Sequence, residues 1–139
     1  MSVIRFEDLI AWRKARELRK TIYCISSQPP FSRDFQMRNQ IRGAALSVMS
    51  NIAEGFERNG IPEFLHFLRI ANASCAEVRS QLYAAFDEGY LATATLPGLL
   101  DETRVVSRVI RGLEKSLIAK LGTGHWAPGT GHESCFLRT

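Results

Sequence analysis

The chain has 139 residues, of which 45% are hydrophobic and 23% are charged, a balance typical of one folded domain with a sizeable core. Eighteen lysines and arginines against fourteen acidic residues give a net charge of +4, which permits a nucleic-acid partner without requiring one. No apolar run approaches the roughly 20 residues of a membrane span, and the N-terminus has no signal-peptide core, so we expect a cytoplasmic protein.

The first predicted helix runs from Glu7 to Ser27. Its apolar residues recur at alternating spacings of four and three, which is the rhythm of one seam in a helical bundle: Ala11, Ala15, Leu18, Ile22 and Ile25. Pro29 and Pro30 end the helix because proline lacks an N–H donor and disfavours the helical conformation of the residue before it. Phe31 is expected to close this end of the bundle.

The second predicted helix begins after an N-cap at Ser32 or Asp34 and runs to Arg58, where Asn59 and Gly60 stop it. Its apolar residues cover an arc of roughly 200°, which is wider than the ~100° a helix needs to dock on one core. One stripe of this arc continues the bundle seam. The second stripe, predicted to be an oligomer interface, contains Leu46, Met49, Ala53 and Phe56.

The third predicted helix opens with Pro62 and Glu63 and closes at Gly89. It carries an unbroken heptad pattern in Phe64, Leu68, Ala71, Cys75, Val78, Leu82 and Ala85. Tyr90 and Leu91 are expected to fold back onto the last turn as a hydrophobic cap.

The fourth predicted helix opens at Pro97 or Asp101, and its seam contains Leu99, Val106, Ile110, Leu113 and Leu117. No segment shows the alternating apolar pattern of a β-strand. Four amphipathic helices on short loops predict an all-α, antiparallel up-and-down four-helix bundle over residues 1–121. Residues 122–139 are rich in glycine and lack periodicity, so we expect them to form a flexible C-terminal tail.

Metal chemistry has little support in the sequence. The tail contains His125, His132 and Cys135, but structural zinc takes four ligands in paired short spacings and only one such pair is present. Three cysteines cannot form a closed disulfide framework. Cys24 and Cys75 fall on or near core seams and are expected to act as small hydrophobes.

Catalysis has little support either. His66 follows Glu63 in a Glu-x-x-His pattern that occurs once, whereas a di-iron bundle needs it twice. No nucleophile and base stand at a recognisable spacing. Asn51, Glu54 and Gly55 of the second helix fit a structural role, in helix register, ion pairing and close helix approach. We therefore expect no enzymatic activity and no cofactor.

Basic residues on three predicted helices form the candidate nucleic-acid-binding surface. They are Arg13, Arg16 and Lys20 on the first helix, Arg38 and Arg42 on the second, and Arg104, Arg108, Arg111 and Lys115 on the fourth. The last four repeat at spacings of four, three and four, so they form a row that can follow phosphates. No motif that reads bases accompanies them, which predicts weak, largely non-specific binding. The alternative is a solvated surface balanced by Glu102 and Glu114.

One segment of the second helix carries a resemblance to a known family. Ser50-Asn51-Ile52-Ala53-Glu54-Gly55, preceded by Gln40-Ile41-Arg42 and Ala44-Ala45, resembles the signature of bacterial four-helix-bundle proteins encoded within 23S rRNA intervening sequences. The resemblance covers about Phe6 to Leu121. This chain departs from the family's pattern at Gly43, where a second arginine is usual, and at Met49, where proline is common.

The resemblance implies a homo-oligomer in the form of a five-fold ring of bundles. The family is also similar to the pentameric accessory variability protein of diversity-generating retroelements, which partners a reverse transcriptase and RNA. Sequence and resemblance together predict a non-enzymatic oligomeric scaffold that binds RNA or DNA and partners a nucleic-acid enzyme. The alternative is a protein–protein interaction module with no nucleic-acid role, in which acidic neighbours would pair with the exposed basic residues.

Overall fold

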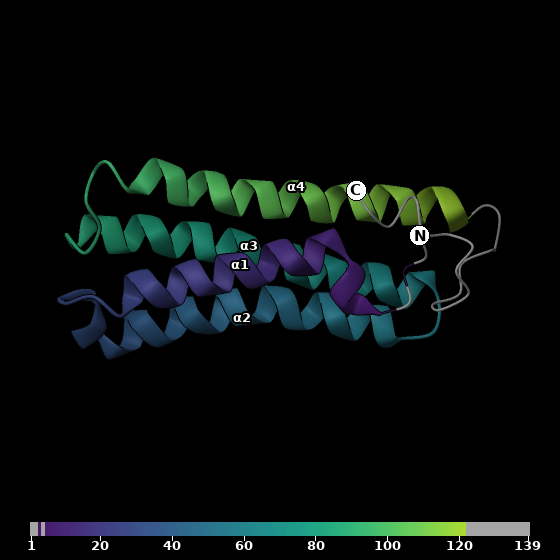
Figure 1. Ribbon diagram of the computed structural model, residues 1–139, viewed down its shortest axis with the longest axis horizontal. Coiled ribbons are helices and arrows are strands. Elements are labelled where there is room, and N and C mark those ends of the chain that lie inside the picture. The colour runs from purple at the N-terminus through teal and green to yellow at the C-terminus, as the bar shows by residue number, and fades with distance from the viewer. Residues whose placement is uncertain (1–2, 4, 122–139) are drawn as a thin grey trace.

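The computed structural model describes residue 3 and residues 5–121, so the predicted tail lies outside the described residues. Four long helices lie side by side, and consecutive helices are joined at alternating ends of the molecule (Figure 1). They are α1 (Ile10–Ser26), α2 (Phe35–Glu57), α3 (Ile61–Asp87) and α4 (Leu96–Leu121). Two short 3-10 turns, η1 (Phe6–Asp8) and η2 (Phe31–Arg33), precede α1 and α2. Residue 3 and residues 5–121 contain no strand, and the predicted all-α four-helix bundle is confirmed.

The predicted start of the first helix at Glu7 is wrong. Phe6–Asp8 form the 3-10 turn η1, and Leu9 follows in an extended conformation before α1 begins at Ile10. The break lets the Leu9 side chain enter the core, where it is fully buried. Phe6 packs edge-on against Trp12, with ring centroids 5.2 Å apart, and holds the turn on the outside of α1.

The contacts around Asp34 close one end of the bundle. The Met37 N–H donates to Asp34 Oδ1 at 3.1 Å, so Asp34 is the N-cap of α2, as the sequence allowed. Tyr90 O–H donates to the other carboxylate oxygen at 2.8 Å, and its ring stacks on the buried Phe31 at 5.2 Å. The Tyr90 N–H reaches back to the Ala85 carbonyl at 2.9 Å. The predicted roles of Phe31 and Tyr90 at this end are confirmed.

The remaining helix boundaries follow the predicted stop and start residues closely. Pro62 lies in the first turn of α3, after Gly60 with a φ of +106°. Gly89, with a φ of +82°, ends α3 two residues beyond Asp87. Of the two predicted openings of α4, the structure uses the one near Pro97.

The predicted heptad seams of α1, α3 and α4 form a large part of the core. All seven seam residues of α3 and all five of α4 are buried. On α1, four of the five are buried and Ile25 packs against the core from its edge. The 4,3 spacing places these side chains on one helix face, so each helix presents a single apolar stripe to the interior.

Gly55 allows α2 and α3 to approach closely. A Cβ atom at Gly55 would lie 2.8 Å from the Phe67 Cβ and 3.0 Å from the Phe64 Cδ1. The next residue, Phe56, is 2% exposed and packs edge-on against Phe64 with ring centroids 6.0 Å apart. Its assignment to an oligomer interface is therefore wrong, because the close approach of α3 encloses the far end of the second stripe.

We expect Gly55→Ala to lower the free energy of unfolding by about 1–3 kcal/mol, because the new methyl group overlaps Phe67 and Phe64. Gly43→Ala is the matched control on the same helix. No heavy atom lies within 4 Å of a Cβ at Gly43, so this change should raise stability by about 0.5–1 kcal/mol through helix propensity. Urea unfolding followed by circular dichroism measures both, and equal effects would contradict the close contact.

Candidate nucleic-acid interface

Arg42 of α2 binds the C-terminal end of α1. Its Nε donates to Ser26 Oγ at 2.8 Å, and its Nη2 donates to Ser27 Oγ at 2.9 Å and to the Tyr23 carbonyl at 3.3 Å. A helix C-terminus has unpaired carbonyls and a partial negative charge, which a guanidinium stabilises. Arg38 likewise donates to a backbone carbonyl in the turn before α2, at 3.1 Å. Both arginines contribute to the fold.

The three basic residues of α1 in the predicted surface, Arg13, Arg16 and Lys20, each have a local partner. Arg13 Nε donates to the Glu7 carbonyl at 2.8 Å. The Arg16 guanidinium lies 5.6 Å from the centroid of the Trp12 ring. Lys20 Nζ lies 3.4 Å from an acidic side chain one turn away. These contacts are exposed and individually weak, so the three side chains lie on a solvated surface where local contacts already engage them.

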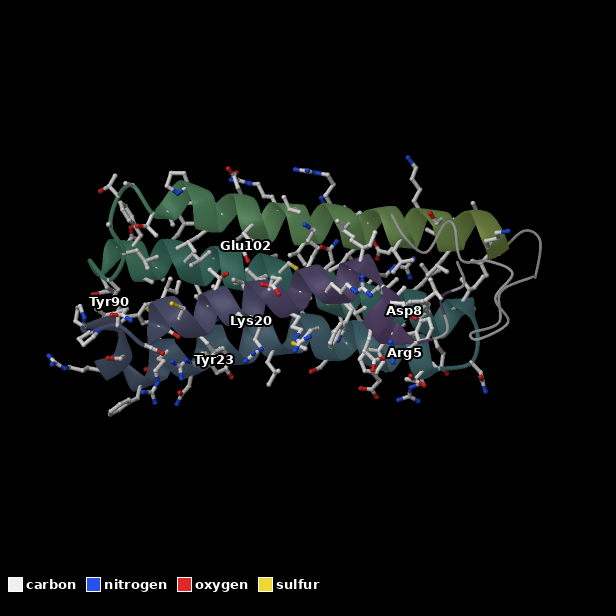
Figure 2. The ribbon with its side chains drawn as sticks, viewed as in Figure 1. Arg5, Asp8, Lys20, Tyr23, Tyr90 and Glu102 are labelled. Atoms are coloured by element: carbon white, nitrogen blue, oxygen red, sulfur yellow. The ribbon has the colours of Figure 1, made fainter. Side chains whose placement is uncertain are left out.

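The row on α4 differs from the α1 face. Its four residues are exposed, and nitrogen-tipped side chains project from the outer side of α4 in Figure 2. Arg104 pairs with Asp101 at 3.2 Å. Across residues 5–121, Arg108, Arg111 and Lys115 make no ion pair. Three neighbouring positive charges on one face of α4 are therefore available to a ligand.

A groove of about 460 Å³ between α3 and α4 adds two basic residues that the sequence reading missed, Arg69 and Arg79. Its lining residues are Arg69, Asn72, Ala73, Ala76, Arg79, Ser107, Arg111 and Glu114. Arg111 thus belongs to both the α4 row and the groove. In the sequence, Arg69 and Arg79 each follow directly after a seam residue of α3, a signal that places them beside the core but does not show which helix lies opposite.

Burial and nearby charges shift the pKa values of two groups, Glu114 in the lining of this groove and Cys75 beside Arg79 and Arg111. Partial burial raises the pKa of Glu114, and nearby Arg69 and Arg111 offset part of this effect. Burial raises the pKa of the Cys75 thiol to about 12, although Arg79 and Arg111 act in the opposite direction. Cys75 therefore stays a neutral thiol at physiological pH, and its burial confirms its predicted role as a small hydrophobe.

Cys24 does not share that role, and its predicted place near the core is wrong. It is exposed on α1, where Ile22 and Ser26 occupy the buried positions on either side. His66 is exposed. The described residues contain no group of three or more side chains able to hold a metal ion. Nor is any helix among them long and apolar enough to cross a bilayer.

The sequence model of the 23S rRNA-intervening sequence proteins matches residues 7–112, which is most of the chain. The chain belongs to this family. Its fold resembles that of a protein of unknown function from the S23 ribosomal protein family of Bacteroides thetaiotaomicron VPI-5482. The two are 18% identical with a TM-score of 0.69, and the match covers 76% of this chain and 99% of the other. No curated protein matches the chain.

Asn51 and Glu54, two of the residues that carry the resemblance to 23S rRNA-intervening sequence proteins, contact other residues of the bundle, Asn51 toward α3 and Glu54 at the exposed surface of α2. Asn51 Nδ2 donates to the Ser47 carbonyl at 2.8 Å and to Ser47 Oγ at 2.9 Å. Ser47 Oγ in turn lies 2.9 Å from Ser74 Oγ of α3. Glu54 pairs with Arg58 at 2.8 Å. This polar chain links α2 to α3, which favours a structural role.

Three residues of the predicted interface stripe lie at the surface of α2. Leu46 is 44% exposed, whereas Met49 and Ala53 are half-buried. Met49 also packs against the core. Ser50, one position beyond Met49, is exposed. The stripe available to another subunit is therefore narrower than predicted, because Phe56 belongs to the core.

Two arginine substitutions should separate structural from free basic residues. Arg42→Ala removes the partner of the Tyr23 carbonyl and of two serine hydroxyls at the end of α1, and should cost about 1–3 kcal/mol of unfolding free energy. Arg108→Ala, at an exposed position with no ion pair to any described residue, should change stability by less than about 0.5 kcal/mol. Urea unfolding measures the difference, and equal effects would show that Arg42 does not stabilise α1.

Proposed function

We propose that the protein is a non-enzymatic oligomeric scaffold that binds RNA or DNA weakly, with little sequence preference, through the basic side of α4. The observation that carries this proposal is the set of three exposed positive charges, Arg108, Arg111 and Lys115, which make no ion pair with any described residue. Contacts between such side chains and phosphates release counterions, and this gives affinity without base readout. Membership in a family named for 23S rRNA intervening sequences supports an RNA partner.

Assembly would multiply this weak binding. A ring of five subunits, as the family resemblance implies, repeats the net charge of +4 around one particle. Several weak phosphate contacts on one particle then act together with a high effective local concentration. The exposed Leu46 and half-buried Met49 and Ala53 supply the apolar stripe for subunit contact. A reverse transcriptase or another nucleic-acid enzyme is the kind of protein that such a scaffold would hold near its template.

A second groove supports the alternative, a protein–protein interaction module. It has a volume of about 400 Å³, lies between α2 and α3, and is lined by Gln36, Asn39, Gln40, Gly43, Ala44, Ser47 and Glu77. Amide and hydroxyl groups can both donate to and accept from a peptide, while the one carboxylate disfavours phosphate. This surface fits a protein partner better than a nucleic acid.

The nucleic-acid proposal is tested by titrating labelled 23S rRNA fragments and generic duplexes at increasing salt. Affinity should fall linearly on logarithmic axes, as counterion release requires. The triple variant Arg108→Gln, Arg111→Gln, Lys115→Gln should bind more weakly, and its salt slope should be lower by about 2–3 units.

The matched control removes the same charge from α1 through Arg13→Gln, Arg16→Gln and Lys20→Gln, where local partners already engage the side chains. This control should retain most of the affinity. An equal loss in both triple variants would contradict the assignment to α4. Absence of binding by the unaltered protein at low salt would favour the protein-partner module.

The oligomer proposal is tested by light scattering at micromolar concentration. The unaltered protein should show a mass several times that of one chain. Leu46→Glu should lower this mass and leave helical content intact, because Leu46 is 44% exposed and lies outside the core. Ile118→Glu is the control, since Ile118 is 51% exposed on α4, away from the stripe. A monomer mass for the unaltered protein would contradict the proposal.

A further inference from the structure

The groove between α3 and α4 is rich in positive charge. Arg69 and Arg79 line it from α3, and Arg111 lines it from α4. A guanidinium can direct two parallel N–H groups at one phosphate, which makes arginine well suited to this ligand. None of the three makes an ion pair with another described residue. Their donors therefore remain available to an anion in the groove.

Asn72 contributes a further donor. Its Oδ1 accepts a 2.5 Å hydrogen bond from Ser107 Oγ, and Ser107 is only 3% exposed. The buried hydroxyl thus holds the Asn72 amide in one orientation, with the oxygen occupied. The Nδ2 group, which has no acceptor among residues 5–121, is left for a ligand in the groove that Asn72 lines.

The shape and length of the groove fit a flexible strand. Arg69 and Arg79 are ten positions apart on α3, a rise of about 15 Å, so the groove is long enough to take more than one phosphate of a strand. A single strand can bend to follow the groove, whereas a duplex is stiff over tens of base pairs. Ala73 and Ala76 are the small apolar residues of the lining, which has no aromatic side chain on which bases could stack.

We propose that this groove binds successive phosphates of a single-stranded nucleic acid, so that the protein prefers single-stranded segments to duplexes. The proposal rests on the nucleic-acid function proposed above and specifies its ligand. Arg111 connects the groove to the α4 row, so one strand can contact both surfaces. Glu114 is the one carboxylate in the lining, and it weakens binding by repelling phosphate.

The test compares a single-stranded oligonucleotide with a duplex of the same sequence, by fluorescence anisotropy at several salt concentrations. The variant Arg69→Gln, Arg79→Gln should bind the single strand about tenfold more weakly, with a salt slope lower by about 1.4, while duplex affinity falls less than about threefold. The control Arg104→Gln, Arg108→Gln removes the same charge from the outer side of α4. It should weaken both ligands to a similar extent.

The second variant, Glu114→Gln, controls for loss of folding, because it should bind more tightly and a misfolded protein would not. Glu114→Gln should tighten single-strand binding by about threefold by removing the repulsion. Glu102→Gln makes the same charge change on α4, but Glu102 faces α1, where Thr21 donates to it at 3.1 Å. This control should change affinity by less than about 1.5-fold, because the charge it removes lies farther from the strand.

Three outcomes would overturn the inference. Equal losses for single strand and duplex in the Arg69→Gln, Arg79→Gln variant would show that the groove does not distinguish them. Unchanged binding by Glu114→Gln would show that no phosphate lies near that carboxylate. Either result leaves the proposed function intact. Failure of the unaltered protein to bind any oligonucleotide at low salt would overturn the proposed function and this inference together.

Discussion

The close approach of α2 and α3 at Gly55 is the constraint on which the rest of the bundle depends. With no side chain at Gly55, the Phe67 and Phe64 side chains of α3 lie against the backbone of α2. The same two helices are also joined by hydrogen bonds that run from Asn51 to Ser47 within α2 and from Ser47 to Ser74 of α3. Because α4 packs on α3, the position of α3 also determines where the groove between these two helices opens.

The basic residues divide into two groups according to their contacts. Arg42 and Arg38 donate to backbone carbonyls next to helix ends, where a cation offsets unpaired acceptors. Arg108, Arg111 and Lys115 are exposed on α4 and make no ion pair with any described residue. Charge alone does not separate these groups, because each side chain carries one positive charge. A surface that can bind phosphate is therefore distinguished by side-chain N–H donors without partners, and not by its total charge.

The two grooves of the bundle differ in chemistry although they share α3. The groove toward α4 presents three guanidiniums and one carboxylate, whereas the groove toward α2 presents amides, a hydroxyl and one carboxylate. Under the function proposed above, a phosphate backbone would occupy the groove toward α4 and a protein partner would occupy the groove toward α2. The two partners would then not compete for one surface.

The sequence alone determined the helices and most of the core. A 4,3 spacing places seam residues such as Leu68 and Leu82 on one face whatever lies opposite, and a capping carboxylate such as Asp34 acts on its own helix. Only the tertiary structure decided the burial of Phe56 and the capping role of Arg42. Arg42 contacts residues 15 to 19 positions away at the end of α1, and the groove lined by Arg69, Arg79 and Arg111 needs α3 and α4 together. Local periodicity shows which face of a helix is apolar, but not how near the next helix lies or which polar groups it brings.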